Sequence, residues 1–238
     1  MSSMRAPIVA VMPARGGSKR IPHKNLRSFA GRPMLAWPLE AAAQADCFDR
    51  IVVSTDDPDI AAAARAHGAE TPFARPAFLS DDHTPTAPVI AHAVTALDLP
   101  PNAAVCCIYP TAPFLKAADL RAGLARLEAD AVGFVLPVTS YAFPIQRALR
   151  RDTGGRITMH DPSAFSTRSQ DLEPAWHDAG QFYWARAATW SSGRPVFGSG
   201  SIGLAVPPYR VQDIDTPEDW TRAELMHTVL AAAEVEDK

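Results

Sequence analysis

The chain has 238 residues, a hydrophobic share of 47% and a formal net charge of −3. This length suits one large domain with a buried core, and the weakly negative charge argues against a general nucleic-acid-binding protein. We expect no membrane anchor and a cytoplasmic location, because the sequence has neither an apolar run long enough to span a bilayer nor a signal-peptide core at its N-terminus. Cys106 and Cys107 are adjacent in an apolar run, which favours reduced core thiols.

The first 140 residues alternate between strand-like and helix-like segments. Apolar runs predict strands, in chain order, at 8–12, 51–54, 105–109 and 132–138. Helical spacing and boundary residues predict helices at 34–45, 59–67, 86–97 and 117–129. This alternation is typical of an α/β fold with a Rossmann-like, mostly parallel sheet that is flanked by helices.

The pattern weakens at about 140–180, which we interpret as an arm or subdomain inserted into a single domain spanning 1–238. The segment contains a glycine pair, isolated arginines and few apolar runs, although three aromatic residues give it side chains to pack: Phe143, Phe165 and Trp176. Strand-like segments return at 181–185 and 202–206. A final helix is expected at 218–233, with three residues as candidate core contacts: Trp220, Leu225 and Val229.

A basic, glycine-containing loop follows the first predicted strand. Five of the chain's 23 Lys and Arg residues lie between Arg15 and Arg27, around the pair Gly16-Gly17. Glycine lets backbone N–H groups approach an anion closely, and the cations neutralise its charge. At the carboxyl end of a strand, this pattern is typical of a triphosphate site, although the P-loop motif is absent. A solvated basic turn is the alternative.

Asp213 and Asp215 form the second candidate site. In an extended segment both side chains point to one face while Ile214 points to the core. Two carboxylates together with substrate phosphates are a usual way of holding Mg²⁺. The alternative is a structural role, because Asp215 precedes the final helix and is a suitable capping residue.

Two further polar segments lie near predicted strand ends. For 54–57, which follows the second strand, we favour a helix cap over a ligand contact. In the loop 75–84, Arg75 is suited to contact a base or a phosphate. Ser80, Asp81 and Thr84 in that loop either cap the next helix or contact a ribose, and the sequence does not decide between them.

Several other patterns are weaker. Arg147 and Arg168 suit carboxylate recognition, but a lone arginine is more often a surface residue. His177 and Asp178 are adjacent on an expected strand, so their side chains face opposite ways and we do not expect a dyad. The G-x-G-x-x-G match at 198–203 does not open a helix, which excludes a dinucleotide fingerprint.

The segments 13–25, 53–57, 75–84, 111–113 and 213–215 together resemble the CMP-acylneuraminate cytidylyltransferase family, whose members attach CMP to nine-carbon 2-keto sugar acids. Within it, 106–114, 143–149, 177–184 and 209–220 are similar to the pseudaminic acid branch. Tyr109 stands where the sialic acid branch commonly has a glutamine, so contacts to the acyl sugar are not carried over at this position.

The resemblance implies CTP and a nonulosonic acid as substrates, Mg²⁺ as cofactor, and a homodimer in which the inserted region reaches across the partner. The residues expected at the nucleotide are Ala14, Arg15, Gly16, Gly17, Ser18, Lys24, Asn25, Arg75 and Ser80. Those expected to carry the reaction are Arg15, Lys24, Asp213 and Asp215, the last two as metal ligands. Those expected at the sugar acid are Arg147, Arg168 and Gln181.

In the implied reaction the anomeric hydroxyl of the sugar acid attacks the α-phosphorus of CTP and pyrophosphate leaves. No residue stands out as the general base, and a metal-bound or phosphate-assisted proton transfer is equally open. Legionaminic, N-acetylneuraminic and 3-deoxy-octulosonic acids are alternative acceptors. A sugar-1-phosphate nucleotidylyltransferase would usually carry a longer Gly-Thr-Arg loop, and a non-catalytic regulator would not need two metal ligands. The CMP-sugar would serve flagellin or surface-glycan synthesis.

Overall fold

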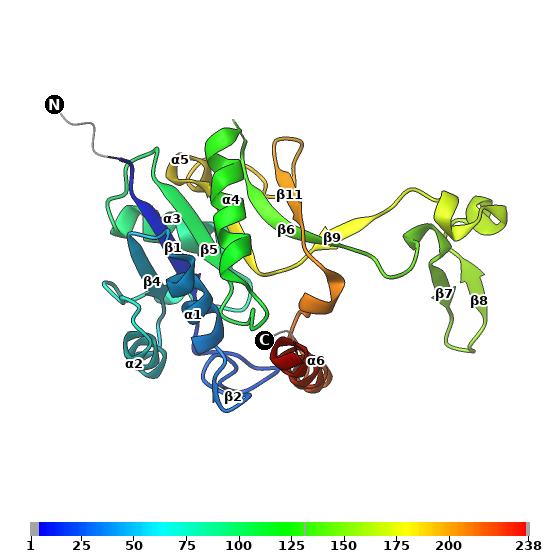
Figure 1. Ribbon diagram of the computed structural model, residues 1–238, viewed down its shortest axis with the longest axis horizontal. Coiled ribbons are helices and arrows are strands. Elements are labelled where there is room, and N and C mark those ends of the chain that lie inside the picture. The colour runs from blue at the N-terminus through cyan, green and yellow to red at the C-terminus, as the bar shows by residue number, and fades with distance from the viewer. Residues whose placement is uncertain (1–4, 131, 237–238) are drawn as a thin grey trace.

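The computed structural model describes residues 5–130 and 132–236. Its centre is a seven-stranded sheet in the order β11-β6-β10-β5-β1-β4, with β9 paired to the far end of β6 (Figure 1). The strands are β1 Ile8–Pro13, β4 Arg50–Ser54, β5 Ala104–Ile108, β6 Val135–Ser140, β9 Trp176–Asp178, β10 Phe182–Arg186 and β11 Ile202–Ala205. A small separate hairpin is formed by β2 Ser28–Phe29 and β3 Arg32–Pro33.

The predicted α/β class and its parallel core are confirmed. β1 pairs in parallel with β4 on one side and with β5 on the other, so that Met12 lies opposite Val53 and Val11 opposite Cys107. β11 also runs parallel to β6, whereas β10 is antiparallel to both β5 and β6. The carboxyl ends of β1, β4 and β5 therefore meet at one edge, and three of the sequence motifs follow those strands.

Helices cover both faces of the sheet (Figure 1). They are α1 Ala36–Ala45, α2 Pro58–Ala66, α3 Thr86–Ala96, α4 Ala117–Ala129, the short α5 Ala187–Trp190 and α6 Pro217–Glu236. Helix α1 begins at Ala36, two positions later than the predicted start at Met34. The later start places Pro38 in the first turn, where its missing N–H is not needed. Within the described residues no helix is long and apolar enough to cross a membrane.

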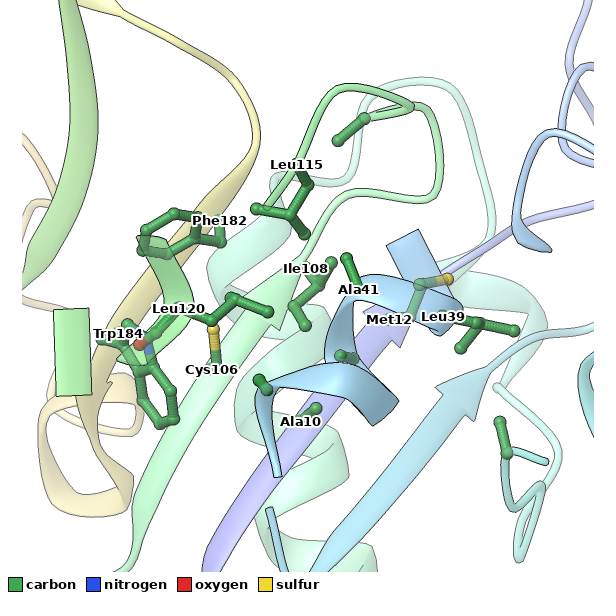
Figure 2. Close-up of a cluster of buried hydrophobic side chains, with 14 of the residues drawn as sticks. Ala10, Met12, Leu39, Ala41, Cys106, Ile108, Leu115, Leu120, Phe182 and Trp184 are labelled. Carbon is green, nitrogen blue, oxygen red and sulfur yellow. The ribbon is translucent and has the colours of Figure 1, made fainter. Parts of the chain in front are cut away.

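The sheet separates two apolar clusters. One cluster lies beneath α1 and α4 and contains Met12, Leu39, Leu120 and Trp184 (Figure 2). The other lies beneath α3 and α5 and contains Val11, Ile90 and Trp190 among others. Consecutive residues of β1 alternate between the two clusters, as expected for a strand buried on both faces. This rigid centre supports the loops at the carboxyl edge.

The favoured interpretation of 54–57 is confirmed, because Asp57 caps α2. Its carboxylate accepts hydrogen bonds from the N–H groups of Asp59 at 2.8 Å and Ile60 at 3.1 Å, and Pro58 occupies the first helical position. The cap fixes the direction in which the chain leaves β4, and so places Asp56 beside the basic loop.

Helix α6 closes a third apolar cluster, in which Trp220 packs with Ile214, Ile21 and Phe29. The expectation for the other two core contacts is wrong, since Leu225 is 65% exposed and Val229 is 68% exposed. The buried stripe instead continues through Ala223, Met226 and Leu230, at helical spacing from Trp220. A pattern of apolar residues on several sides of a helix does not tell which side faces the core.

The segment 140–180 leaves the sheet after β6 and projects from the body of the molecule (Figure 1). It carries the hairpin β7 Leu149–Arg151 and β8 Ile157–Met159 with three short 3-10 turns at Ile145–Arg147, Pro162–Ser166 and Ser169–Asp171, and it rejoins the sheet at β9. The three aromatic residues expected to pack within it do not do so, because Phe143 is 82% exposed, Phe165 is 76% exposed and Trp176 is 52% exposed. We call this segment the arm.

Candidate active site

A cavity of about 450 Å³, here called the basic cavity, lies at the carboxyl ends of β1 and β5. It is lined by Pro13, Arg15, Ser18, Lys19, Arg20, Lys24, Asn25, Asp82, Tyr109, Pro110, Thr111 and Asp215. Four of these residues are cationic and two are acidic, which gives the cavity an excess of positive charge. The structure thus brings together Arg15, Ser18, Lys24 and Asn25 from the predicted nucleotide site, and adds Lys19 and Arg20 from the same loop.

Hydrogen bonds hold the backbone of the basic loop. The Asn25 amide donates to the carbonyl of Arg15 at 3.0 Å, and the Gly16 N–H donates to the Asp56 carboxylate at 3.2 Å. Ala14 is fully buried and its N–H donates to the Ser54 carbonyl at 3.0 Å. Ala14 and Gly16 therefore shape the loop, and the N–H of each has a protein partner.

Asp82 forms ion pairs with two cationic side chains at one end of the basic cavity. Arg15 Nη1 and Lys19 Nζ each lie 2.5 Å from one of its carboxylate oxygens. The hydrogen bonds from Lys19 and then Arg15 lower the pKa of Asp82 to about 2, so the carboxyl is ionised at neutral pH. These two cations already converge on one anionic group. Sequence reasoning did not assign Asp82 or Lys19 to the site. The only signal was that they lie in 75–84 and 13–25, two of the segments that resemble the cytidylyltransferase family.

Lys24 and Arg20 contact the acidic pair at the other end. Lys24 Nζ donates to the Ile214 carbonyl at 2.7 Å and lies 3.4 Å from Asp215 Oδ1. Arg20 Nη1 lies 2.9 Å from Asp215 Oδ2. Lys24 is mostly enclosed, and Arg20 is largely exposed. The basic loop and the segment before α6 therefore form one electrostatic unit.

Asp213 and Asp215 do not lie in a hydrogen-bonded strand, which corrects the expected local structure. The predicted alternation still holds, because Ile214 between them is fully buried in the third apolar cluster. Asp215 does not cap α6. Thr216 does so instead, since its hydroxyl accepts from the Asp219 N–H at 3.2 Å while the Asp219 carboxylate accepts from the Thr216 N–H at 2.9 Å.

A second cavity of about 550 Å³ adjoins the first, and we call it the tyrosine cavity. Its lining consists of Tyr109, Thr111, His177, Asp178, Ala179, Gly180, Tyr183, Val211, Gln212 and Asp213. Tyr109 and Thr111 line both cavities, and Asp213 faces the second while Asp215 faces the first. The acidic pair therefore stands where the two cavities meet.

Hydrogen bonds fix the two tyrosines of the tyrosine cavity. The Tyr109 and Thr86 hydroxyls are 3.0 Å apart, and the Tyr183 hydroxyl donates to the Asp178 carboxylate. The two rings meet edge to face with centroids 5.4 Å apart. Burial raises the pKa of both phenols, so that they stay protonated at neutral pH. They present a rigid, uncharged wall.

The acidic pair is suited to a divalent cation. Partial burial, and then the negative charge of Asp215, raise the pKa of Asp213, so a cation beside the pair would relieve an unfavourable interaction. The described residues contain no group of three or more His, Cys, Asp or Glu side chains arranged for a metal. The protein thus offers two carboxylates, and further ligands would have to come from a bound molecule or from water.

Arg75 and Ser80 do not line either cavity. Arg75 is buried, and its guanidinium donates to the Ser54 carbonyl and lies 3.3 Å from the Ser54 hydroxyl. Burial lowers the pKa of Arg75 to about 10. Ser80 donates to the Pro76 carbonyl at 3.2 Å, while Asp81 closes a turn onto the N–H of Thr84 at 2.7 Å. In this chain they brace the loop that carries Asp82.

The three residues expected at the sugar acid lie outside the tyrosine cavity of their own chain. On the arm, Arg147 contacts the Ser169 hydroxyl at 3.2 Å and Arg168 pairs with Asp171 at 2.7 Å. Gln181 is buried and donates to the Arg210 carbonyl at 2.7 Å, beside the cavity. The tyrosine cavity is built instead from residues that the sequence did not single out for this role, among them Tyr183.

Comparisons with known proteins identify relatives of this chain. Residues 9–155 match the model of the family described as Cytidylyltransferase. The pseudaminic acid cytidylyltransferase of Campylobacter jejuni serotype O:23/36 is 36% identical over 223 residues, which cover 93% of this chain and 96% of the relative. The CMP-N,N'-diacetyllegionaminic acid synthase of Legionella pneumophila is 31% identical, with 91% of this chain and 94% of the relative covered.

Solved structures share the fold. A CMP:2-keto-3-deoxy-manno-octonic acid synthetase complexed with CTP matches 96% of this chain and 100% of its own, with a TM-score of 0.70 and 19% identity. A 4-diphosphocytidyl-2C-methyl-D-erythritol synthase from Anaerococcus prevotii matches 94% of this chain and 96% of its own, with a TM-score of 0.65 and 14% identity. At these identities the likeness concerns the architecture.

Proposed function

The chain belongs to the cytidylyltransferase family, and we propose that it transfers CMP from CTP to the anomeric hydroxyl of pseudaminic acid with release of pyrophosphate. The observation that carries the proposal is the meeting of two cavities at Asp213 and Asp215. A triphosphate in the basic cavity would have its α-phosphate near that junction, and an acceptor in the tyrosine cavity would approach it from the other side. Relatives named for pseudaminic acid support the choice of acceptor.

The basic cavity has the charge that phosphoryl chemistry needs. Negative charge builds on the phosphate oxygens during transfer, and fixed cations stabilise it most effectively when they are already in place. Lys24 is enclosed and held by the Ile214 carbonyl, so it needs little reorganisation to meet the triphosphate. Arg15 and Lys19 are positioned to hold the phosphates that leave as pyrophosphate, once these displace Asp82.

Asp213 and Asp215 would hold Mg²⁺, with substrate phosphates as further ligands. The bound ion would neutralise the phosphates and polarise the reacting centre. Arg20 now contacts Asp215 and is long enough to turn toward a triphosphate when a cation takes its place, while Lys24 keeps its hydrogen bond to the Ile214 carbonyl. The protein side of the site then consists of the acidic pair with Lys24 and Arg20 beside it at one end of the basic cavity, and Arg15 and Lys19 at the other end.

We propose a homodimer in which the arm of one copy docks on the other. Its support is an apolar groove of about 390 Å³ lined by residues that include Tyr209, Leu225 and Val229. The exposed aromatic residues of the arm are also apolar, so the two surfaces are suited to cover each other. Val211 lines both this groove and the tyrosine cavity. An arm docked there would bring its own arginines near the acceptor, which supports the proposed roles of Arg147 and Arg168.

A cytoplasmic location is part of the proposal. The three cysteines are unpaired, which suits a reducing compartment. Cys106 and Cys107 are fully buried, and burial raises the pKa of both thiols, so neither is a reactive thiolate at neutral pH.

The test is pyrophosphate release from CTP and Mg²⁺, with pseudaminic, legionaminic and N-acetylneuraminic acids supplied separately. Release with pseudaminic acid alone is the expected result. Release with another acid only would retain the reaction and replace the acceptor. No pyrophosphate release with any of the three acids, in a preparation that binds CTP, would overturn the proposed transfer.

A further inference from the structure

We propose that His177 is the catalytic base that removes the proton of the attacking hydroxyl. The inference rests on the proposed function and assigns a role that the cations and the acidic pair leave open. His177 lies on β9 and lines the tyrosine cavity, as Asp213 does. Among the described residues that line the two cavities of the site, His177 is the only histidine.

A backbone contact fixes the tautomer of the His177 ring. Its Nδ1 atom lies 2.8 Å from the carbonyl oxygen of Asp178. A carbonyl oxygen only accepts hydrogen bonds, so Nδ1 must carry the proton. In the neutral ring Nε2 then holds a lone pair and is the nitrogen that can accept a proton. The expectation that His177 and Asp178 form no dyad agrees with this contact, which involves the carbonyl and not the carboxylate.

Neighbouring side chains hold the ring in place. Tyr141 lies against it with ring centroids 4.8 Å apart. Thr139 of β6 is directly opposite His177 in the antiparallel register, so the two side chains share one face of the sheet. With one nitrogen bonded and a tilted neighbouring ring in contact, the His177 ring has little freedom to turn. A base held in this way needs no rearrangement before the proton is transferred.

The other titratable groups of the tyrosine cavity are less suited to this role. The Asp178 carboxylate accepts from the Tyr183 hydroxyl and from the Gly180 N–H, the latter at 3.0 Å. The two tyrosines are buried and protonated, and Asp213 belongs to the proposed cation site. Among the described titratable groups of the tyrosine cavity, His177 therefore remains, because the lone pair on its Nε2 atom has no assigned hydrogen-bond partner.

In the proposed step, transfer of a proton to His177 accompanies attack on the α-phosphorus. The O–H bond of the anomeric hydroxyl breaks and its proton moves to Nε2, while the oxygen forms a bond to the α-phosphorus. The bond from that phosphorus to the bridging oxygen breaks, and pyrophosphate leaves with the electron pair. The resulting imidazolium returns its proton to water after the products leave, so no additional reactant is needed.

The test compares two substitutions of the same residue. His177→Asn keeps an N–H near the Nδ1 position for the Asp178 carbonyl but has no ring nitrogen to accept a proton. We expect its kcat to fall by about 100-fold or more, with the KM for CTP and the melting temperature unchanged. His177→Ala opens space for a free base, and added imidazole should restore turnover in a saturable way. His67→Asn, an exposed change next to the end of α2, is the matched control and should behave as wild type.

Each outcome decides the proposal. A wild-type kcat in His177→Asn would show that only the hydrogen bond to the backbone matters and would overturn the catalytic role. A loss in both variants that imidazole fails to restore would overturn it as well. If His177→Asn does not fold, imidazole rescue of His177→Ala decides alone. Failure of the wild-type chain to release pyrophosphate would overturn the proposed function, and the role of His177 with it.

Discussion

The Nζ atom of Lys24 lies 3.4 Å from Oδ1 of Asp215, although the two residues are 191 positions apart in the sequence. The same nitrogen donates to the carbonyl of Ile214, whose side chain is buried in the cluster that anchors α6. The contact joins the loop after β1 to the segment before α6. It brings the cations expected at a triphosphate and the carboxylates expected at a metal into one site.

Asp215→Ala should abolish turnover and leave the fold intact. The side chain is partly exposed and caps no helix, so we expect the free energy of unfolding to change by no more than about 0.5 kcal/mol. Loss of a metal ligand should lower kcat by about 100-fold or more. Steady-state kinetics and urea unfolding measure the two effects, with the exposed Asp59→Asn as control. A variant that fails to fold would move Asp215 to a structural role.

Lys24→Ala should weaken the use of CTP. Removing an enclosed cation that meets the triphosphate should raise the KM for CTP by about tenfold, because charge-assisted hydrogen bonds contribute about 1.5–3 kcal/mol. The control is Arg126→Ala, which removes a cation on the surface of α4. Unchanged CTP kinetics in the Lys24 variant would remove this residue from the site.

The two adjacent glycines of the basic loop should differ in their tolerance of alanine. A Cβ at Gly16 would lie 2.9 Å from Asp57 Cβ and still closer to its carboxylate, so Gly16→Ala must displace the residue that caps α2. We expect a loss of about 1 kcal/mol or more in unfolding free energy, together with weaker CTP binding. At Gly17 the nearest atom is 3.9 Å away, so Gly17→Ala should unfold like wild type.

Calorimetric titration with CTP then separates the two glycines. Weaker CTP binding in a stable Gly17→Ala variant would show that the triphosphate approaches the Gly17 backbone. Equal stability of the two alanine variants would contradict the geometry described for Gly16.

Asp82→Asn should lower the KM for CTP. The ionised carboxyl holds Arg15 and Lys19 and competes with the triphosphate for both cations. Removing its charge should free them, and the improvement should diminish as salt is added because the pairs are partly exposed. Initial rates at several CTP and salt concentrations measure the effect. A higher KM would mean that Asp82 holds the cations in the geometry that CTP needs.

The capping box of α6 should make stability depend on pH. Hydrogen bonds from Thr216 lower the pKa of Asp219, so its contribution is fully present above the pKa of the unfolded chain, about 4, and is lost as pH falls through the lower folded value. The stability difference between wild type and Asp219→Asn should therefore shrink as pH is lowered from 7 toward 3. Urea unfolding at a series of pH values measures it, and a constant difference would contradict the prediction.

The regular elements were predictable because their patterns are local. β1 follows from a continuous apolar run, and α2 from a capping aspartate before a proline. The loop at Arg15 was singled out because it combines glycines and cations after a strand, and the structure places it at a cavity; its role as a triphosphate site stays a prediction. The position of Asp213 and Asp215 was expected as well, since a buried Ile214 between them needs only simple alternation.

The remaining features depend on contacts between distant residues. Asp82 belongs to the basic cavity because a loop folds back on Arg15, 67 positions away, and no local pattern encodes that. The buried side of α6 is chosen by Phe29 and Ile21, which are remote in sequence, so Leu225 was misplaced. Phe143 and Phe165 were expected to pack within the arm but are exposed, because a single sequence does not tell a buried aromatic residue from an exposed one.

The most direct test of the central claim follows the α-phosphate. CTP labelled with ³²P at that position is incubated with Mg²⁺ and pseudaminic acid, and the labelled products are separated for wild type and Asp215→Ala. We predict that the wild type moves the label into a product that contains both CMP and the sugar acid, with one pyrophosphate released per transfer, and that the variant leaves it in CTP. Label that stays in CTP with the wild type, or that appears only as free CMP, would contradict the proposed transfer of CMP to the sugar acid.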